Sequence, residues 1–170
     1  DGTRLLSQEI VVGRESDKPV NVASGSLPVI NEEAFLASLD DNGKAVISPL
    51  LELAKSKSMP VHWGTKGFSL NVDINGTHVA VCFGYPAGSV YKQSIYTALR
   101  GRGGMSSKTS IPEGVVEKLW GQAESTGLFN PAGRELKCSL NREFTETELS
   151  TLFSWIESVA DTVREHGLKE

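Results

Sequence analysis

The sequence predicts an α+β fold: a mostly antiparallel sheet that contains a hairpin over residues 68–83 and packs against several helices, including a long C-terminal helix. The first observation is an Asn-Gly pair at positions 75–76, flanked on both sides by alternating apolar and polar residues. That pattern is the strongest short-range hairpin signal. The second observation is that segments with helical spacing and cap residues flank this hairpin, which favours helices layered on an antiparallel sheet.

The bulk composition indicates one globular domain with an N-terminal extension. Hydrophobic residues make up 39% of the chain and charged residues 22%, as in ordinary globular domains. Residues 1–30 are rich in Ser, Pro, Gly and Asn, which predicts a linker or the tail of a preceding domain. Residues 31–170 are predicted to form a single compact α+β domain.

The first residues, the lack of long apolar runs and the two cysteines indicate the setting in which the protein works. The chain starts without an initiator Met or a signal-peptide pattern, so we interpret it as part of a longer protein whose other domains are expected partners. No apolar run approaches the roughly 18 residues that span a bilayer, and no membrane partner is expected. Cys82 and Cys138 are predicted to be reduced, buried thiols, which is typical of a cytoplasmic protein.

Two short helices are predicted before the sheet. Asn31 can cap the first helix, whose apolar face contains Phe35 and Leu39. The second is predicted over residues 45–56, with Pro49 in its first turn, because a proline further inside would remove a hydrogen bond.

The hairpin register follows from a two-residue turn at positions 75–76. Counting outward predicts an apolar face with the pairs Ile74–Thr77, Val72–Val79, Leu70–Val81 and Phe68–Phe83. It predicts an opposite face with the pairs Asp73–His78, Asn71–Ala80 and Ser69–Cys82. The second strand is apolar in both rows, which indicates a central position, and residues 61–63 are predicted to add a third strand.

The C-terminal half is predicted to contain further helices and one strand. Residues 89–101 have apolar spacing that favours a helix, and the following GRGGMSSKTS is predicted to be a flexible loop. A helix is predicted from Pro112 to near Thr126, followed by a turn at NPAG and a strand over residues 136–140. Thr145 and Glu148 form a capping-box pattern for a final helix that ends at Gly167.

Charge is unevenly distributed along the chain. The formal net charge is −4, yet there is no Asp or Glu between Ile74 and Pro112. This segment contains the candidate anion-binding residues Lys92, Arg100, Arg102 and Lys108, and the candidate stacking residues Tyr85, Tyr91 and Tyr96. Basic side chains interleaved with aromatic ones suit phosphates and stacked bases, although the acidic sequence pI of about 5.5 opposes general nucleic-acid binding.

Catalytic candidates are weak. The Asp73 carboxylate could orient His78 as an imidazole base. No Ser or Cys lies in a nucleophile-elbow motif, so we interpret Asp73 and His78 as a structural ion pair. Glu135 and Lys137 resemble half of a magnesium-dependent nuclease core, with Asp73 as a second acid. The histidines are scattered and the cysteines lack CxxC spacing, so no metal site and no cofactor are expected, apart from Mg²⁺ under the nuclease hypothesis. The segment ending in Lys108 lacks the glycine that a phosphate-binding loop needs before its lysine.

These observations favour a non-catalytic accessory or interaction domain of a larger protein, with an anionic partner as a further expectation. One alternative is a nucleic-acid-binding module associated with a nuclease or restriction-type enzyme. Another is a magnesium-dependent, nuclease-like enzyme that uses Asp73, Glu135 and Lys137.

Overall fold

A six-stranded antiparallel sheet forms the centre of the computed structural model, which describes residues 27–168. Across the sheet the strands run in the order β2 (Val61–Trp63), β3 (Phe68–Ile74), β4 (Thr77–Tyr85), β5 (Ser94–Thr97), β7 (Glu135–Ser139) and β6 (Asn130–Ala132). The predicted α+β class is confirmed. The predicted linker lies almost wholly outside the described residues, and the division into linker and domain stays a prediction.

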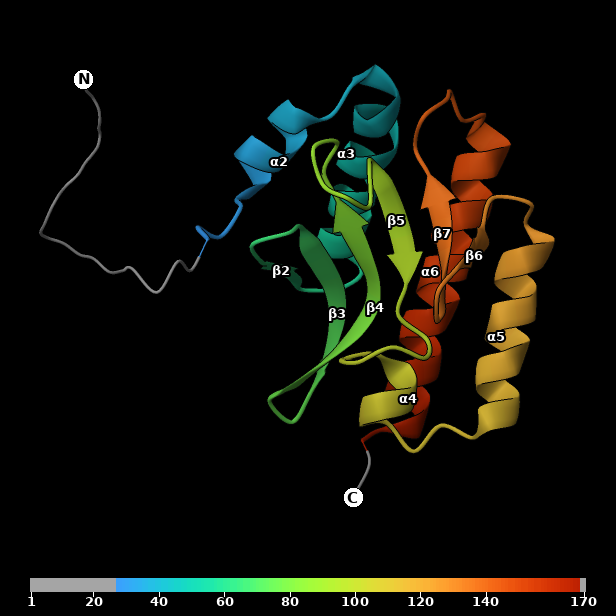
Figure 1. Cartoon of the computed structure of the whole chain (residues 1–170). Coiled ribbons are helices and arrows are strands. Elements are labelled where there is room, and N and C mark those ends of the chain that lie inside the picture. Colours follow the sequence, from blue (N-terminus) through green and yellow to red (C-terminus); the bar gives the residue numbers. More distant parts are fainter. Residues whose placement is uncertain (1–26, 169–170) are drawn as a thin grey trace, which may run out of the picture.

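Helices lie before, between and after the strands. They are α2 (Glu32–Ser38), α3 (Asp41–Ser56), α4 (Met105–Lys108), α5 (Glu113–Ser125) and α6 (Glu146–His166). Figure 1 shows α3 and α6 side by side behind the sheet, with α5 beside α6. None of these helices is long and apolar enough to cross a membrane.

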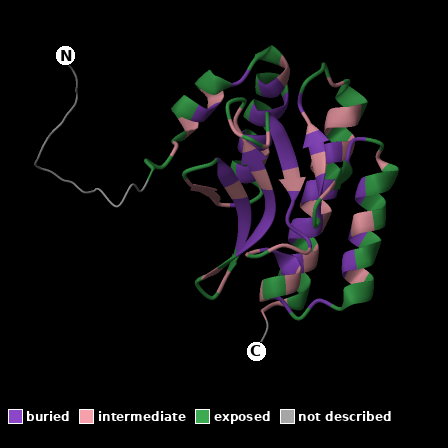
Figure 2. Cartoon of the chain, viewed as in Figure 1, coloured by how far each residue is buried: buried purple, intermediate pink, exposed green. Residues whose placement is uncertain are grey.

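The hydrophobic core lies between the sheet and this helix layer. Strand residues such as Leu70, Ile95 and Leu136 are fully buried in one cluster with helix residues such as Leu50 and Ile156. Figure 2 shows the buried residues concentrated along β3, β4 and β5 and on the sides of α3 and α6 that meet them. Burial of these side chains supplies most of the driving force for folding.

The N-terminal helices are capped by their own side chains. The Oδ1 of Asn31 accepts a hydrogen bond from the amide of Ala34 at 2.7 Å, which confirms the predicted cap. The second helix starts earlier than predicted, because the Oδ1 of Asp40 caps it by accepting from the amide of Gly43 at 2.9 Å. The predicted place of Pro49 in the first turn is therefore wrong. Pro49 lies inside α3 on its exposed side, where water can bond to the carbonyl left without a partner.

The turn of the β3–β4 hairpin is as predicted. Asn75 and Gly76 have φ values of 50° and 82°, as a tight two-residue turn requires. The four predicted pairs nearest the turn are confirmed: Ile74–Thr77, Asp73–His78, Val72–Val79 and Asn71–Ala80.

Beyond these pairs the register shifts by one residue at Val81. Cys82 instead lies opposite Leu70, so the predicted pairing of Leu70 with Val81 is wrong. The same shift overturns two other predicted pairs, Ser69–Cys82 and Phe68–Phe83. A bulge inserts an extra residue into one strand and bends it. As a result Val81 and Cys82 are both in the core, and Phe83 lies opposite Ser69.

Two further predictions between the hairpin and α5 are wrong. Residues 89–101 form no helix; they contain the strand β5, which pairs with β4 on one side and β7 on the other. The predicted loop GRGGMSSKTS contains the short helix α4, and the side chain of Met105 is buried in the core.

After α5, the predicted turn at NPAG contains β6, which pairs with β7.

The C-terminal elements agree with the sequence pattern. Pro112 is the N-cap of α5, and the strand around residues 136–140 is present as β7. The capping box of α6 is formed: Thr145 accepts from the amide of Glu148, and the Glu148 carboxylate accepts from the amide of Thr145. The helix ends at Gly167, whose φ of 72° is accessible to glycine.

Candidate functional site

The candidate site lies on the face of the sheet turned away from α3 and α6, called here the outer face. One row of directly opposed residues crosses all six strands on this face: His62, Ser69, Phe83, Tyr96, Lys137 and Asn130. Side chains alternate between the two faces along a strand, and Ile95 and Leu136, which neighbour this row, belong to the core. None of the row residues belongs to that core cluster. The row therefore defines a separate, partly exposed surface.

Three tyrosines lie together on the outer face and form what we call the tyrosine cluster: Tyr85 on β4, Tyr91 in the following loop and Tyr96 on β5. The ring centroids of Tyr85 and Tyr91 are 4.2 Å apart, and Tyr96 lies 5.3 and 5.5 Å from them. These distances and tilts are typical of favourable aromatic pairs. The structure thus brings together all three residues predicted to stack, and their rings pack against one another, with Tyr96 edge-on to the other two.

Partial burial raises the pKa of two phenols in this cluster. It raises the pKa of Tyr85 to about 12, with the neighbouring Tyr91 and Tyr96 as smaller causes. Burial also raises the pKa of Tyr96. The hydroxyl groups of Tyr85 and Tyr96 carry protons at neutral pH and can donate hydrogen bonds to an acceptor.

Lysines surround the tyrosine cluster. Lys137 places its Nζ 6.0 Å from the Tyr96 ring centroid, and lines a hollow of about 430 Å³ together with Lys92. Lys66 lines two adjoining hollows, one of about 250 Å³ with Tyr85 and one of about 350 Å³ with Tyr91. Among the described residues none of these lysines has a salt-bridge partner. Their charges remain available to an anionic group.

The other predicted anion-binding residues lie elsewhere. The guanidinium of Arg100 packs 4.3 Å over the Trp120 ring and lies 3.6 Å from the Glu113 carboxylate. Lys108 donates from its Nζ to the backbone oxygen of His78 at 2.6 Å. Arg102 is exposed in the loop before α4. Lys92 is the predicted cation that lies near the tyrosine cluster. It lines the same hollow as Lys137, whose Nζ is 6.0 Å from the Tyr96 ring centroid.

The two acids of the nuclease hypothesis do not meet. Asp73 is on β3 and Glu135 on β7, three strands apart in the sheet, or roughly 14 Å at the usual strand spacing. The Glu135 carboxylate is also buried, where it accepts hydrogen bonds from the Thr97 hydroxyl and three backbone amides. The Nζ of Lys137 lies 6.0 Å from the ring centroid of Tyr96. The structure therefore does not assemble this set around one metal ion.

The thiols are not poised for nucleophilic chemistry. Cys82 and Cys138 are free and buried, and burial raises the pKa of each to about 12. They remain protonated at neutral pH, whereas the thiolate is the reactive form.

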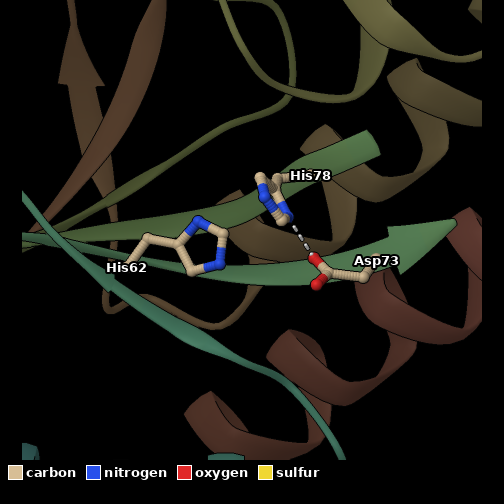
Figure 3. Close-up of side chains that lie close together, drawn as sticks. All are labelled: His62, Asp73 and His78. Carbon is tan, nitrogen blue, oxygen red and sulfur yellow. Dashed lines mark hydrogen bonds and ion pairs between the residues drawn. The ribbon is translucent and has the colours of Figure 1, made fainter. Parts of the chain in front are cut away.

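Asp73 and His78 form the predicted cross-strand pair, and a third residue joins them. The Oδ1 of Asp73 is 2.6 Å from the Nδ1 of His78. His62 on β2 reaches across β3, and its ring lies edge-on to that of His78 with centroids 4.0 Å apart. Figure 3 shows the three side chains converging above adjacent strands. One ligand atom from each lies within 4.8 Å of the others, an arrangement that could hold a metal ion.

The approach of His62 to the Asp73–His78 pair was not predicted, although the sequence contains a signal for it. Gly64 and Gly67 are the first and last residues of the four-residue connection between β2 and β3. A hairpin through this connection places His62 opposite Ser69. Ser69 shares its face with Asp73 in a strand of period two. Phe83 was predicted to lie on the core face; it lies on the outer face because the bulge shifts the register of β4.

Comparison with protein-family models, with curated proteins and with solved structures found no match to this chain.

Proposed function

We propose that the protein is a non-catalytic binding module that holds an acidic polypeptide segment on the outer face of its sheet. The observation that carries the proposal is the tyrosine cluster: three tyrosines in mutual contact outside the core. Tyrosine is enriched at interfaces because its ring buries a large area and its hydroxyl remains able to form hydrogen bonds.

The lysines around the cluster favour an anionic partner. Lys66, Lys92 and Lys137 each line a hollow beside or near the tyrosines, and each is free of ion pairs within residues 27–168. Carboxylates of a bound segment would pair with these ammonium groups, and its apolar side chains would pack on the rings. Such a segment could come from another domain of the same protein or from a separate protein, in the cytoplasm as the buried thiols suggest.

The non-catalytic part of the proposal is supported by the state of the reactive groups. Both thiols are buried and protonated at neutral pH, and the Glu135 carboxylate is occupied by four intramolecular donors. The tyrosine cluster itself offers hydrogen bonds and stacking area rather than a base or a nucleophile.

A single-stranded nucleic acid is the second candidate partner. Aromatic side chains on the face of an antiparallel sheet, next to lysines, are typical of proteins that stack unpaired bases. Against this partner stand the net charge of −4 and the position of Arg100, which packs on Trp120 away from the outer face.

Fluorescence anisotropy would test the proposal. The probes are labelled peptides of alternating acidic and apolar residues, and labelled oligo(dT) and oligo(U), each at low and near-physiological salt. We expect the acidic peptides to bind, and binding to fall at least tenfold in a Tyr91→Ser variant and in a Lys66/Lys92/Lys137 triple Ala variant. A Lys57/Lys118/Arg134 triple Ala variant is the matched control, because it removes the same charge from exposed positions that do not line these hollows.

The outcomes separate the two partners. Equal loss in the control variant would show general charge attraction and overturn the proposed site. Binding of the oligonucleotides alone, with a steep dependence on salt, would replace the polypeptide by a nucleic acid. Failure of every probe to bind at low salt would refute the anionic-partner proposal.

A further inference from the structure

We propose that His62, Asp73 and His78 form a binding site for a divalent transition-metal ion, with Zn²⁺ as the ion that best fits these ligands. This inference is independent of the tyrosine cluster. Three adjacent strands each contribute one side chain: β2, β3 and β4. Imidazole nitrogen and carboxylate oxygen are both common zinc ligands.

The distances are close to those of a loaded site. One ligand atom from each side chain lies within 4.8 Å of the others. Ligand atoms arranged tetrahedrally at about 2.0–2.2 Å from one zinc ion lie roughly 3.3–3.6 Å from each other. The ligand atoms must therefore approach by up to about 1.5 Å, and Asp73 and His78 are exposed enough to rotate.

The backbone holds the three ligands in place before an ion binds. The Asn75-Gly76 turn sets Asp73 opposite His78. On the other side of β3, a hydrogen bond of 2.7 Å from the Gly64 amide to the Gly67 oxygen closes the connection that places His62. Ligands fixed on paired strands lose little conformational entropy on binding, which favours affinity.

An ion pair alone does not explain why the third residue is present. The Asp73–His78 pair is exposed on both sides, with 39% and 49% of the side chains accessible, and such pairs contribute about 0–1 kcal/mol. His62 adds a second imidazole whose ring meets that of His78 edge to face (Figure 3). Two neutral imidazoles and one carboxylate supply three lone-pair donors and reduce the charge of a Zn²⁺ ion to +1.

The exposed setting indicates the type of site. Three protein ligands at a surface leave the fourth tetrahedral position to water, as in open zinc sites rather than closed structural ones. The ammonium of Lys108, bonded to the backbone oxygen of His78, is a neighbouring positive charge that opposes the ion. A Lys108→Met variant should therefore bind zinc more tightly.

Isothermal titration of the untagged, metal-free chain with Zn²⁺ tests the proposal. We expect one ion per chain, and at least tenfold weaker binding in each of His62→Gln, Asp73→Asn and His78→Gln. The matched control is His166→Gln, because His166 is an exposed histidine at the end of α6. This control should bind as the parent does.

Thermal unfolding supplies a second readout that does not depend on the titration. Zn²⁺ should raise the unfolding midpoint of the parent and of His166→Gln, and a chelator should reverse the rise. The same addition should raise the midpoint of His62→Gln less than that of the parent. Absence of zinc binding by the parent, or equal binding by the parent and all three ligand variants, would overturn the site.

Discussion

Glu135 on β7 is bonded to Thr97 on the neighbouring strand β5, with the Thr97 hydroxyl donating to Oε2 at 2.5 Å. The same carboxylate accepts from the backbone amides of Leu99, Arg100 and Gly101 at 2.9, 2.7 and 2.5 Å. These bonds fold the chain sharply after β5 and direct it toward α4. Glu135, which resembled a metal ligand in the sequence, thus accepts the hydrogen bonds of the backbone amides that follow β5.

Replacing this carboxylate should destabilise the fold. In Glu135→Gln the amide group would direct N–H donors at backbone N–H groups, leaving buried donors unsatisfied. We expect a loss of about 2–4 kcal/mol in the free energy of unfolding, measured by urea denaturation. Glu124→Gln, at an exposed position on α5, is the control and should change it by less than about 0.5 kcal/mol. Equal effects of the two substitutions would contradict the assigned role.

Tyrosine titration tests the burial of the cluster. The chain has three tyrosines, and the pKa of Tyr85 is raised to about 12 from an ordinary value of 10.0. Tyrosinate absorbance, recorded immediately after a pH jump, should show a phase near pH 12 that Tyr85→Phe removes and Tyr91→Phe retains. A single transition near pH 10 for all three residues would show that the cluster is open to water.

The same raised pKa affects stability. The folded state holds the Tyr85 proton more tightly than the unfolded state, so its contribution is fully present below pH 10 and is lost as the pH rises toward 12. Between these values the unfolding midpoint of Tyr85→Phe should fall less steeply than that of the parent. Parallel slopes would contradict this linkage.

The N-terminus of α6 should show the opposite dependence on pH. Hydrogen bonds from Arg142 and from the Thr145 amide lower the pKa of the Glu148 carboxyl to about 2 from an ordinary value of 4.5. Its stabilising contribution is therefore present above pH 4.5 and is lost as the pH falls toward 2. Thermal unfolding should show a lower midpoint for Glu148→Gln than for the parent at pH 7, with the gap closing near pH 2. Glu146→Gln, in the same helical turn, is the control, and a gap independent of pH would contradict the prediction.

Sequence patterns predicted those elements whose signals are local. The Asn75-Gly76 turn and the capping box of Thr145 and Glu148 depend on residues within a few positions of each other, and both formed as expected. The alternating hairpin also placed Asp73 opposite His78 without any tertiary information.

Features that depend on distant strands were not predicted. Residues 89–101 had helical spacing, yet residues 94–97 within them form β5, because β4 and β7 pair with both edges of this strand and Ile95 enters the core. The bulge at Val81 has no signature in composition, and it changed which face Phe83 occupies. The tyrosines were singled out by their number in one segment, but their contact depends on how the loop after β4 folds back over the sheet.

Gly104 and Gly121 differ in the space that is available to an added Cβ atom. A Cβ at Gly104 would lie 2.0 Å from the backbone oxygen of Ala98, and this carbonyl cannot retreat because it accepts from the Met105 amide at 2.9 Å. Gly104→Ala should therefore lower the free energy of unfolding by about 3 kcal/mol. A Cβ at Gly121, inside α5, meets nothing within 4 Å.

Gly121→Ala should accordingly raise the free energy of unfolding by about 1 kcal/mol, because alanine loses less backbone entropy in a helix than glycine does. Urea denaturation of both variants and the parent measures the two effects under the same conditions. Destabilisation by both substitutions would show that α5 is packed more tightly at Gly121 than the structure indicates. Tolerance of both would show that the loop before α4 is free to move away from Ala98.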